Sequence, residues 1–336
     1  MKINRYLIIA GCILLTGCGA QNDTISSDGL IATSTPTVVA VNTTAPTDEP
    51  TPVATSTPDS EPTATETIAP TATPVPTATP EAVKPGSSES YSIKSDWEFS
   101  SFAKISSGSA TLYKTSSSNP KNKTICVNAG HGTKGGSNYS VQCHPDGSAK
   151  IVSGSTAAGK TTATAIAYGT EMKDGTSEAT VTKKLALALK DVLLAYGYNV
   201  LMIRESDDVA LDNIARTVMA NNLADCHIAL HYDSTSSDKG AFYMSVPNVA
   251  SYKEMYPVSK TWKESNRLGD SIMAGFKANN IKIFSSGSME MDLVQMSYST
   301  IPNIDLEVGD TASDYSAETL NKLSQGILSG LDIFYK

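Results

Sequence analysis

The chain has 336 residues, of which 40% are hydrophobic and 18% are charged, and its formal net charge at pH 7 is −8. This balance excludes nucleic acids as partners, because nucleic-acid binding needs a basic face. The length would allow two or three domains, but the composition is too uneven along the chain for that division.

The first residues have the pattern of a lipoprotein signal peptide. Lys2 and Arg5 precede an apolar run at residues 6–15, which is too short to span a bilayer as a permanent helix. Small residues follow the run and lead to Cys18. We therefore expect that residues 1–17 are removed, that Cys18 carries lipid, and that the protein is held at the extracellular face of the cell membrane by this lipid only.

Residues 18–90 are rich in Thr, Pro, Ser and Ala and show no helical or strand period. A segment of this composition cannot bury enough apolar surface to offset the entropy of ordering it, so we expect a disordered linker. About seventy such residues reach roughly 50 to 200 Å, depending on whether they form a coil or a polyproline helix. The part of the chain that follows can therefore act well away from the membrane.

Residues 91–336 are expected to form one α/β domain. Strands are predicted at 124–128, 199–204, 225–232, 241–246 and 301–308, and helices at 178–196, 211–222, 258–278 and the C-terminal end. This alternation predicts a twisted, mixed but mostly parallel sheet with helices on both faces. Residues 133–175 show neither a helical nor a strand period of apolar residues, and we interpret them as a long loop of the size that is usually functional or mobile.

Candidate chemistry lies where the predicted strands end. His131, His231 and Glu307 follow or end three strands, and Glu178 stands in the first turn of a helix. Ligands of open α/β sheets bind at the carboxyl ends of strands, and two imidazoles with one carboxylate are a common ligand set for catalytic zinc. Each residue also has another explanation: a histidine between glycines can be merely exposed, and Glu178 complements the helix dipole.

His227 and His231 are four residues apart, as in a helical metal-binding pair. The run is strand-like, however, and position 228 is not a glutamate. On a strand the two histidines lie on one face but about 13 Å apart, which is too far to share one ion. We assign the ligand role to His231 and interpret His227 as a core or interface histidine.

Three cysteines remain in the expected domain, Cys126, Cys143 and Cys226. An odd count argues against a disulfide framework, although one bridge stays open. His144 beside Cys143 in the long loop is interpreted as a surface or substrate residue. A Cys143 nucleophile assisted by His144 is a weaker hypothesis, because adjacent residues seldom face each other.

Several short motifs occur in order along the chain. They are an Asn-Ala-Gly-His-Gly run at 128–132, Glu178 at a helix start, Arg204 after a strand, Arg216 in the next helix, an Ala-Leu-His run at 229–231 and a Leu-Glu-Val-Gly run at 306–309. In this order they resemble the motifs of the zinc-dependent N-acetylmuramoyl-L-alanine amidases of the amidase-3 family. The sequence departs from the family at Asn128, where Asp is frequent, and in the length of the loop between the first two ligand positions.

The resemblance implies a phosphorylase/hydrolase-like fold in which His131, Glu178 and His231 bind Zn2+ and Glu307 is the catalytic acid/base. The remaining motif residues are expected to support the ligands or to contact the substrate, and they are Asn128, Arg204 and Arg216.

The implied function is that of a monomeric peptidoglycan hydrolase that reaches into the cell wall. It would cleave the amide bond between N-acetylmuramic acid and L-alanine with a zinc-activated water. Two alternatives stay open: another zinc amide hydrolase, either a peptidase or a deacetylase, and a non-catalytic wall-binding lipoprotein.

Overall fold

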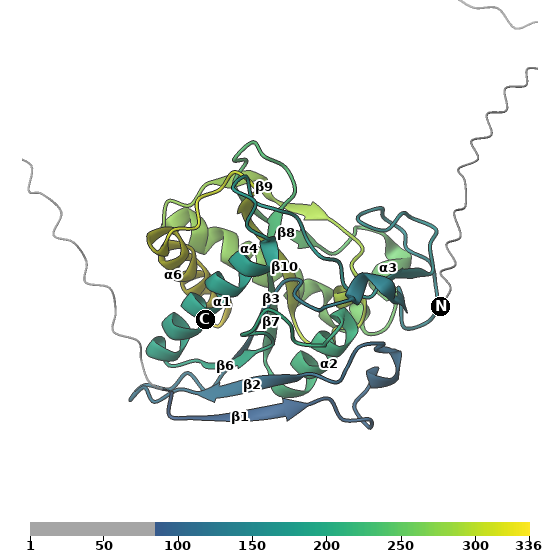
Figure 1. The fold of residues 1–336 in the computed structure, drawn as a ribbon, viewed down its shortest axis with the longest axis horizontal. Helices are drawn as coiled ribbons and strands as arrows, with labels where there is room; N and C mark the ends of the chain where they lie inside the picture. The colour runs from purple at the N-terminus through teal and green to yellow at the C-terminus, as the bar shows by residue number, and fades with distance from the viewer. Residues whose placement is uncertain (1–84) are drawn as a thin grey trace, which may run out of the picture. The chain divides into compact units, whose positions relative to one another are not determined.

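The computed structural model describes residues 85–336, so the expected signal peptide, Cys18 and nearly all of the expected linker lie outside the described residues. The described part belongs to one compact unit built on an eight-stranded sheet, with the strand order β1-β2-β6-β3-β7-β10-β8-β9 (Figure 1). Its strands are β1 (Ser87–Ser92), β2 (Ser109–Lys114), β3 (Thr124–Ala129), β6 (Asn199–Met202), β7 (Cys226–Asp233), β8 (Ala241–Ser245), β9 (Ile283–Glu290) and β10 (Asn303–Asp310).

The sheet is mixed, and its centre is parallel. Strands β6, β3, β7 and β10 pair in parallel in that order, as do β8 and β9, whereas β1, β2 and β8 join their inner neighbours antiparallel. The carboxyl ends of β3, β7 and β10 therefore meet at one edge of the sheet, which is where ligands bind in this architecture.

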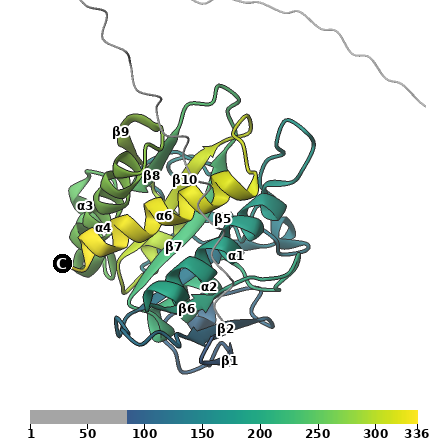
Figure 2. The ribbon, with the colours of Figure 1, turned by 90° about the vertical axis from the view of Figure 1, so that its left-hand side faces the viewer.

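Helices cover both faces of the sheet. They are α1 (Glu178–Tyr196), α2 (Asn213–Leu223), α3 (Ala250–Glu254), α4 (Val258–Ala278), α5 (Val294–Ser297) and α6 (Ala317–Phe334), with short 3-10 turns η1 (Ser100–Phe102) and η2 (Gly136–Asn138). On one face α6 packs between α1 and α4, as Figure 2 shows, and these helices share a core cluster with β3 and β7. Helix α2 packs on the other face against Cys126 of β3 and Leu201 of β6. The predicted α/β fold is confirmed.

Helix α1 has the predicted bounds because both of its ends are capped. Ser177 accepts a hydrogen bond from Thr180 N at the start, and Gly197 ends the helix with φ of 111° and donates to Leu193 O. In the first turns Thr182 Oγ1 donates to Gly130 O at 3.1 Å. This bond fixes the start of α1, and therefore Glu178, beside the turn that follows β3.

Strands β1, β2 and β9 were not predicted. Strand β1 is exposed along nearly its whole length and β9 along much of it, so neither shows the apolar alternation that marks a half-buried strand. Strand β1 also lies across the boundary expected between linker and domain at residues 90 and 91. Backbone pairing with β2 holds it in place.

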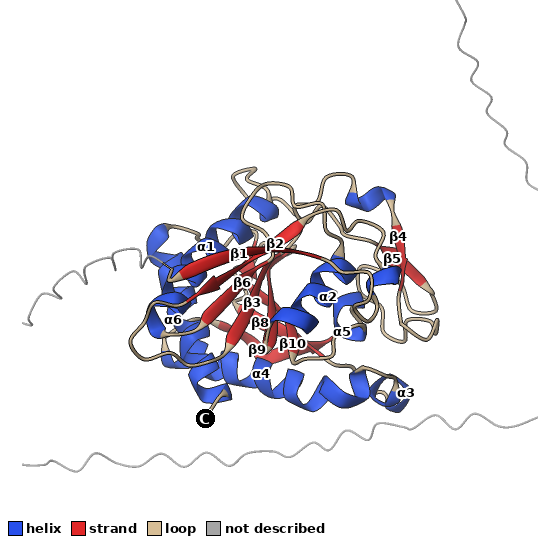
Figure 3. Ribbon diagram, turned by 90° about the horizontal axis from the view of Figure 1, so that it is seen from below, coloured by secondary structure: helices blue, strands red, loops and turns tan. Residues whose placement is uncertain are grey.

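Residues 133–175, here called the loop segment, are more ordered than the expected loop. The segment contains η2 and a two-stranded sheet of β4 (Ser140–Gln142) and β5 (Thr162–Thr164), which Figure 3 shows apart from the main sheet. Val141 and Ala165 of the segment join a core cluster with Val218 of α2. None of the described helices has the length and apolar character needed to cross a membrane.

Candidate active site

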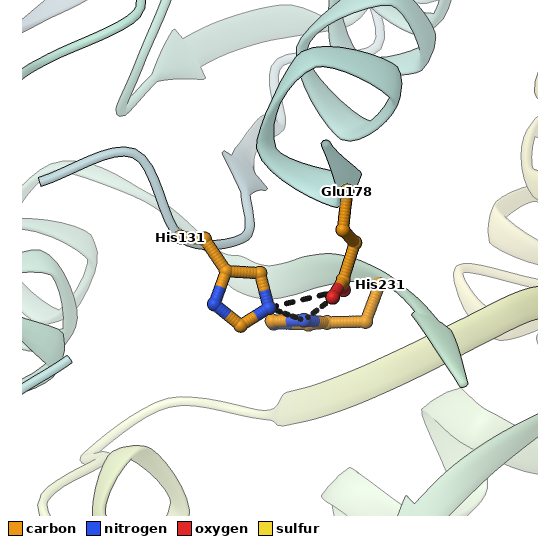
Figure 4. Close-up of side chains that lie close together, drawn as sticks. All are labelled: His131, Glu178 and His231. Atoms are coloured by element: carbon orange, nitrogen blue, oxygen red, sulfur yellow. Dashed lines mark hydrogen bonds and ion pairs between the residues drawn. The ribbon is translucent and has the colours of Figure 1, made fainter. Parts of the chain in front are cut away.

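Three potential metal ligands meet at the carboxyl edge of the sheet (Figure 4). His131 follows β3, Glu178 is the first residue of α1, and His231 lies near the end of β7. His131 Nε2, Glu178 Oε1 and His231 Nδ1 are each 3.0 Å from the other two atoms. Ligand atoms around a tetrahedral zinc lie roughly 3.4 Å apart, so the three side chains need to separate by only a few tenths of an ångström to hold the ion.

The ring of His131 is oriented by the loop segment. Its Nδ1 lies 2.8 Å from Ala167 O, and a carbonyl oxygen can only accept a hydrogen bond. The proton therefore sits on Nδ1, and the lone pair of Nε2 faces Glu178 and His231. His131 itself has a φ of 62°, a left-handed conformation that directs its side chain toward the cleft.

Glu178 uses both carboxylate oxygens. Oε1 faces the two imidazoles and also accepts from Tyr232 N at 3.1 Å, whereas Oε2 accepts from Thr170 N at 2.9 Å. Burial by itself would raise the pKa of Glu178, but hydrogen bonds with His131 and His231 outweigh it and hold the pKa well below its usual range. Glu178 is therefore a carboxylate, the form that binds a metal.

His231 is held between two carboxylates. Its Nε2 lies 3.6 Å from Asp305 Oδ2, on the side opposite Glu178. Burial would lower the pKa of His231, but Asp305, Glu178 and Glu307 raise it to about 10. The three carboxyl groups around His231 thus favour a positive charge between them. The donor set of two imidazole nitrogens and one carboxylate oxygen suits zinc.

Asp305 is a site residue that the sequence analysis missed. It lies on β10 two residues before Glu307, and side chains two apart on a strand point to the same face. The two-residue spacing from Glu307 was therefore the sequence feature that could have indicated Asp305 as a site residue.

Glu307 lies beside the three ligands. It is the parallel register partner of His231, and its side chain is buried, with Oε2 lacking a hydrogen-bond partner among the described residues. Burial raises the pKa of Glu307 well above its usual value, and Asp305 and Glu178 add to this effect while His231 opposes it. A carboxyl group with a raised pKa binds a proton more readily than an exposed one and can pass it on.

These groups open into one cleft of about 590 Å³. The lining includes Ser155 and Tyr168 of the loop segment and Met291 and Leu293 of the segment after β9. The loop segment is fixed to the segment after β9 by Asp292.

The Asp292 carboxylate is completely buried. It accepts from His144 Nε2 at 2.9 Å and from Ile151 N at 2.9 Å, and Lys150 Nζ reaches both its carboxylate and its backbone oxygen. The interpretation of His144 as a surface residue was therefore wrong, because its ring pairs with a buried acid from another part of the chain. Burial also raises the pKa of the neighbouring Cys143 thiol, which argues against the nucleophile hypothesis.

The other sequence-predicted residues do not line the cleft. Arg216 is fully buried and donates to Asn128 Oδ1, Ala129 O and Leu211 O at 3.0 Å, and also to His131 O. Arg204 donates to Gly130 O at 2.9 Å. Both arginines therefore support the turn that carries His131 rather than contacting a substrate.

His227 lies in the core, as predicted. It is fully buried and contacts the side chains of Asn128 and Asn303, and burial lowers its pKa to about 3. It is therefore neutral. The bridge left open by the cysteine count is absent, because Cys126, Cys143 and Cys226 are all free.

Replacing Arg216 with alanine is expected to lower the free energy of unfolding by at least about 3 kcal/mol, because several buried carbonyl oxygens lose their donor. Arg216→Lys keeps the charge but not the fork of donors, so its loss should be smaller than that of alanine. Urea unfolding with a chelator present measures both variants without a contribution from metal. A loss for Arg216→Ala within the roughly 0.5 kcal/mol of a surface substitution would contradict the supporting role.

Known proteins resemble this chain in sequence family and in fold. The family model described as N-acetylmuramoyl-L-alanine amidase matches residues 125–329. The amidase Ami1 from Mycobacterium smegmatis superposes with a TM-score of 0.52 and 19% identity, covering 65% of this chain and 98% of that chain. Ami1 from Mycobacterium abscessus superposes with a TM-score of 0.51 and 18% identity, covering 64% of this chain and 99% of that chain.

Both likenesses concern the fold, and no curated protein sequence matches. The family match extends over more than half of the chain, and the protein is therefore a member of the amidase-3 family, that of the N-acetylmuramoyl-L-alanine amidases.

Proposed function

We propose that the protein is a zinc-dependent amidase that hydrolyses the bond between N-acetylmuramic acid and the L-alanine of the peptidoglycan stem peptide. The observation that carries this proposal is the meeting of His131, Glu178 and His231 within 3.0 Å, in the same cleft as the unpartnered Oε2 of Glu307. Membership of the amidase family supports the choice of substrate.

His131 Nε2, Glu178 Oε1 and His231 Nδ1 would hold the ion. Zinc bound there would lower the pKa of a coordinated water and polarise the scissile carbonyl. The chain keeps the three ligand atoms in place through other contacts: Ala167 O holds His131, Thr170 N holds Glu178, and Asp305 faces His231. Partners of this kind fix the direction of a ligand and raise its affinity for metal.

Glu307 would move the proton. Its Oε2 is free of hydrogen bonds within the described chain and can accept a proton from the attacking water. Because the pKa of Glu307 is raised, the carboxyl group can keep that proton and donate it to the alanine nitrogen as the carbon–nitrogen bond breaks. Acid and base roles therefore fall to one side chain.

The location of the enzyme is part of the same proposal. The lipoprotein signal pattern and Cys18 support an anchor at the extracellular face of the membrane, with the Thr/Pro-rich linker extending the domain into the cell wall. We propose that the protein acts there as a monomer on peptidoglycan.

Digestion of purified peptidoglycan by the full chain tests the activity. Free stem peptides with an L-alanine amino terminus are expected by mass spectrometry, together with about one zinc ion per chain by metal analysis. A chelator should abolish the release of peptides, and stoichiometric zinc should restore it, because the ligand set keeps a position for water.

Other products would contradict the proposed activity. Cuts inside the peptide would indicate a peptidase, and released acetate would indicate a deacetylase. Binding to peptidoglycan without any product, with zinc present, would favour a non-catalytic wall-binding protein.

A further inference from the structure

An aromatic side chain stands exposed at the rim of the metal cleft. Tyr168 is 63% exposed, the highest value among the large hydrophobic side chains of the described residues. It lines the same cleft as His131, Glu178 and Glu307. The other tyrosine of the lining, Tyr232, is only 2% exposed and cannot offer the face of its ring to a ligand.

The backbone on both sides of Tyr168 is attached to metal-ligand candidates. Ala167 O accepts from His131 Nδ1 at 2.8 Å, and Thr170 N donates to Glu178 Oε2 at 2.9 Å. Gly169 packs so closely that a Cβ atom there would lie 2.7 Å from both His131 and Glu178. The backbone of Tyr168 is therefore held beside the metal-ligand candidates, so its side chain starts from a fixed point at the rim of the cleft, and anchoring of the backbone lowers the entropy lost on binding.

The chemistry of the substrate decides what such a ring can bind. On one side of the scissile bond the peptide begins with alanine, which offers only a methyl group. On the other side lies the sugar, whose pyranose ring has a face of C–H groups. These groups carry partial positive charge and pack against the negative face of an aromatic ring.

We propose that Tyr168 stacks on a pyranose ring of the glycan strand and makes the enzyme select glycan-linked over sugar-free amides. This inference rests on the proposed function, because it concerns recognition of the same substrate.

Two substrates distinguish a loss of sugar recognition from a general loss of catalytic activity. A disaccharide–peptide carries the sugar, whereas an N-lactoyl peptide keeps the scissile amide and lacks the sugar. With the zinc-loaded full chain, Tyr168→Ala should raise KM for the disaccharide–peptide roughly three- to tenfold with little change in kcat. Its kcat/KM on the N-lactoyl peptide should stay at the wild-type value.

Two further variants serve as controls. Tyr168→Phe keeps the ring and should behave as wild type, because stacking does not need the hydroxyl. Tyr139, in the same loop segment, is 51% exposed but does not line the cleft. Tyr139→Ala should therefore leave kcat and KM unchanged for both substrates. Calorimetric titration of the disaccharide–peptide into the catalytically impaired Glu307→Gln chain, with and without Tyr168→Ala, measures the loss of affinity directly.

Several outcomes would overturn the stacking role. These are an equal loss on both substrates, a loss in Tyr168→Phe as large as in Tyr168→Ala, or a zinc content reduced in Tyr168→Ala. A wild-type chain that releases no stem peptide contradicts the proposed function instead. The titration then decides the stacking by itself, and an affinity unchanged by Tyr168→Ala overturns it.

Discussion

Glu307→Gln is expected to reduce the rate of amide hydrolysis by about 10²- to 10⁴-fold, because glutamine cannot take a proton from water or return one to the alanine nitrogen. Glu307 is not one of the three residues that would hold the zinc, which are His131, Glu178 and His231. The zinc content of the variant should therefore stay at the wild-type value. Initial rates of stem-peptide release, measured beside metal analysis of the same preparation, check both expectations. Glu254→Gln, at an exposed position on α3, is the matched control.

The stability of the same variant separates a catalytic role from a structural one. Burial and nearby carboxylates raise the pKa of Glu307 above its unfolded value. A carboxyl group with a raised folded pKa contributes stability below its unfolded pKa and loses that contribution as the pH rises through the folded pKa. The metal-free wild-type protein therefore loses this contribution as the pH rises, whereas a neutral glutamine has no charge to bury.

Metal-free Glu307→Gln should consequently be at least as stable as metal-free wild type at alkaline pH, as measured by thermal unfolding over a pH series. An inactive variant that also unfolds more easily across the whole series would count against the catalytic assignment. Functional groups kept at some cost to stability are common in active sites.

The residues of the site that the sequence predicted are ionisable side chains at the ends of strands or at the start of a helix. His131 follows a buried strand, Glu178 follows a capping serine, and His231 and Glu307 sit near the ends of two further strands. The parallel pairing of β7 with β10 sets His231 opposite Glu307. Strand ends and helix caps can be recognised from periodicity, so these four positions could be named as candidates before the fold was known, whereas their roles were implied by the family resemblance.

The part that was missed acts through backbone groups or through distant pairing. Ala167 contributes its carbonyl oxygen and Thr170 its amide, and neither contact depends on the identity of the side chain. Asp292 pairs with His144, 148 residues earlier in the chain, within a segment that shows no periodicity. Such contacts are set by tertiary packing, which a local pattern does not contain.

The loop segment would therefore make the proposed metal centre depend on residues that do not contact the ion. Gly169 is the sharpest case, because its φ of +87° is unfavourable for any side chain and a Cβ would lie 2.7 Å from Glu178 Oε2 and His131 Cδ2. Gly169→Ala should push the two ligands from their positions. We expect zinc affinity to fall by about 10- to 100-fold, as when a group that orients a ligand is lost, and competition with a chromogenic chelator measures it.

Two other glycines of the loop segment separate this clash from backbone strain. Gly159 and Gly175 have nearly the same φ, +83° and +84°, but a Cβ at either position meets nothing within 4 Å. Gly159→Ala and Gly175→Ala should each lose about 1–2 kcal/mol of stability and keep wild-type zinc affinity. Equal losses of affinity in all three variants would show that strain is transmitted through the segment. Unchanged affinity in Gly169→Ala would show that the ligands hold their positions without it.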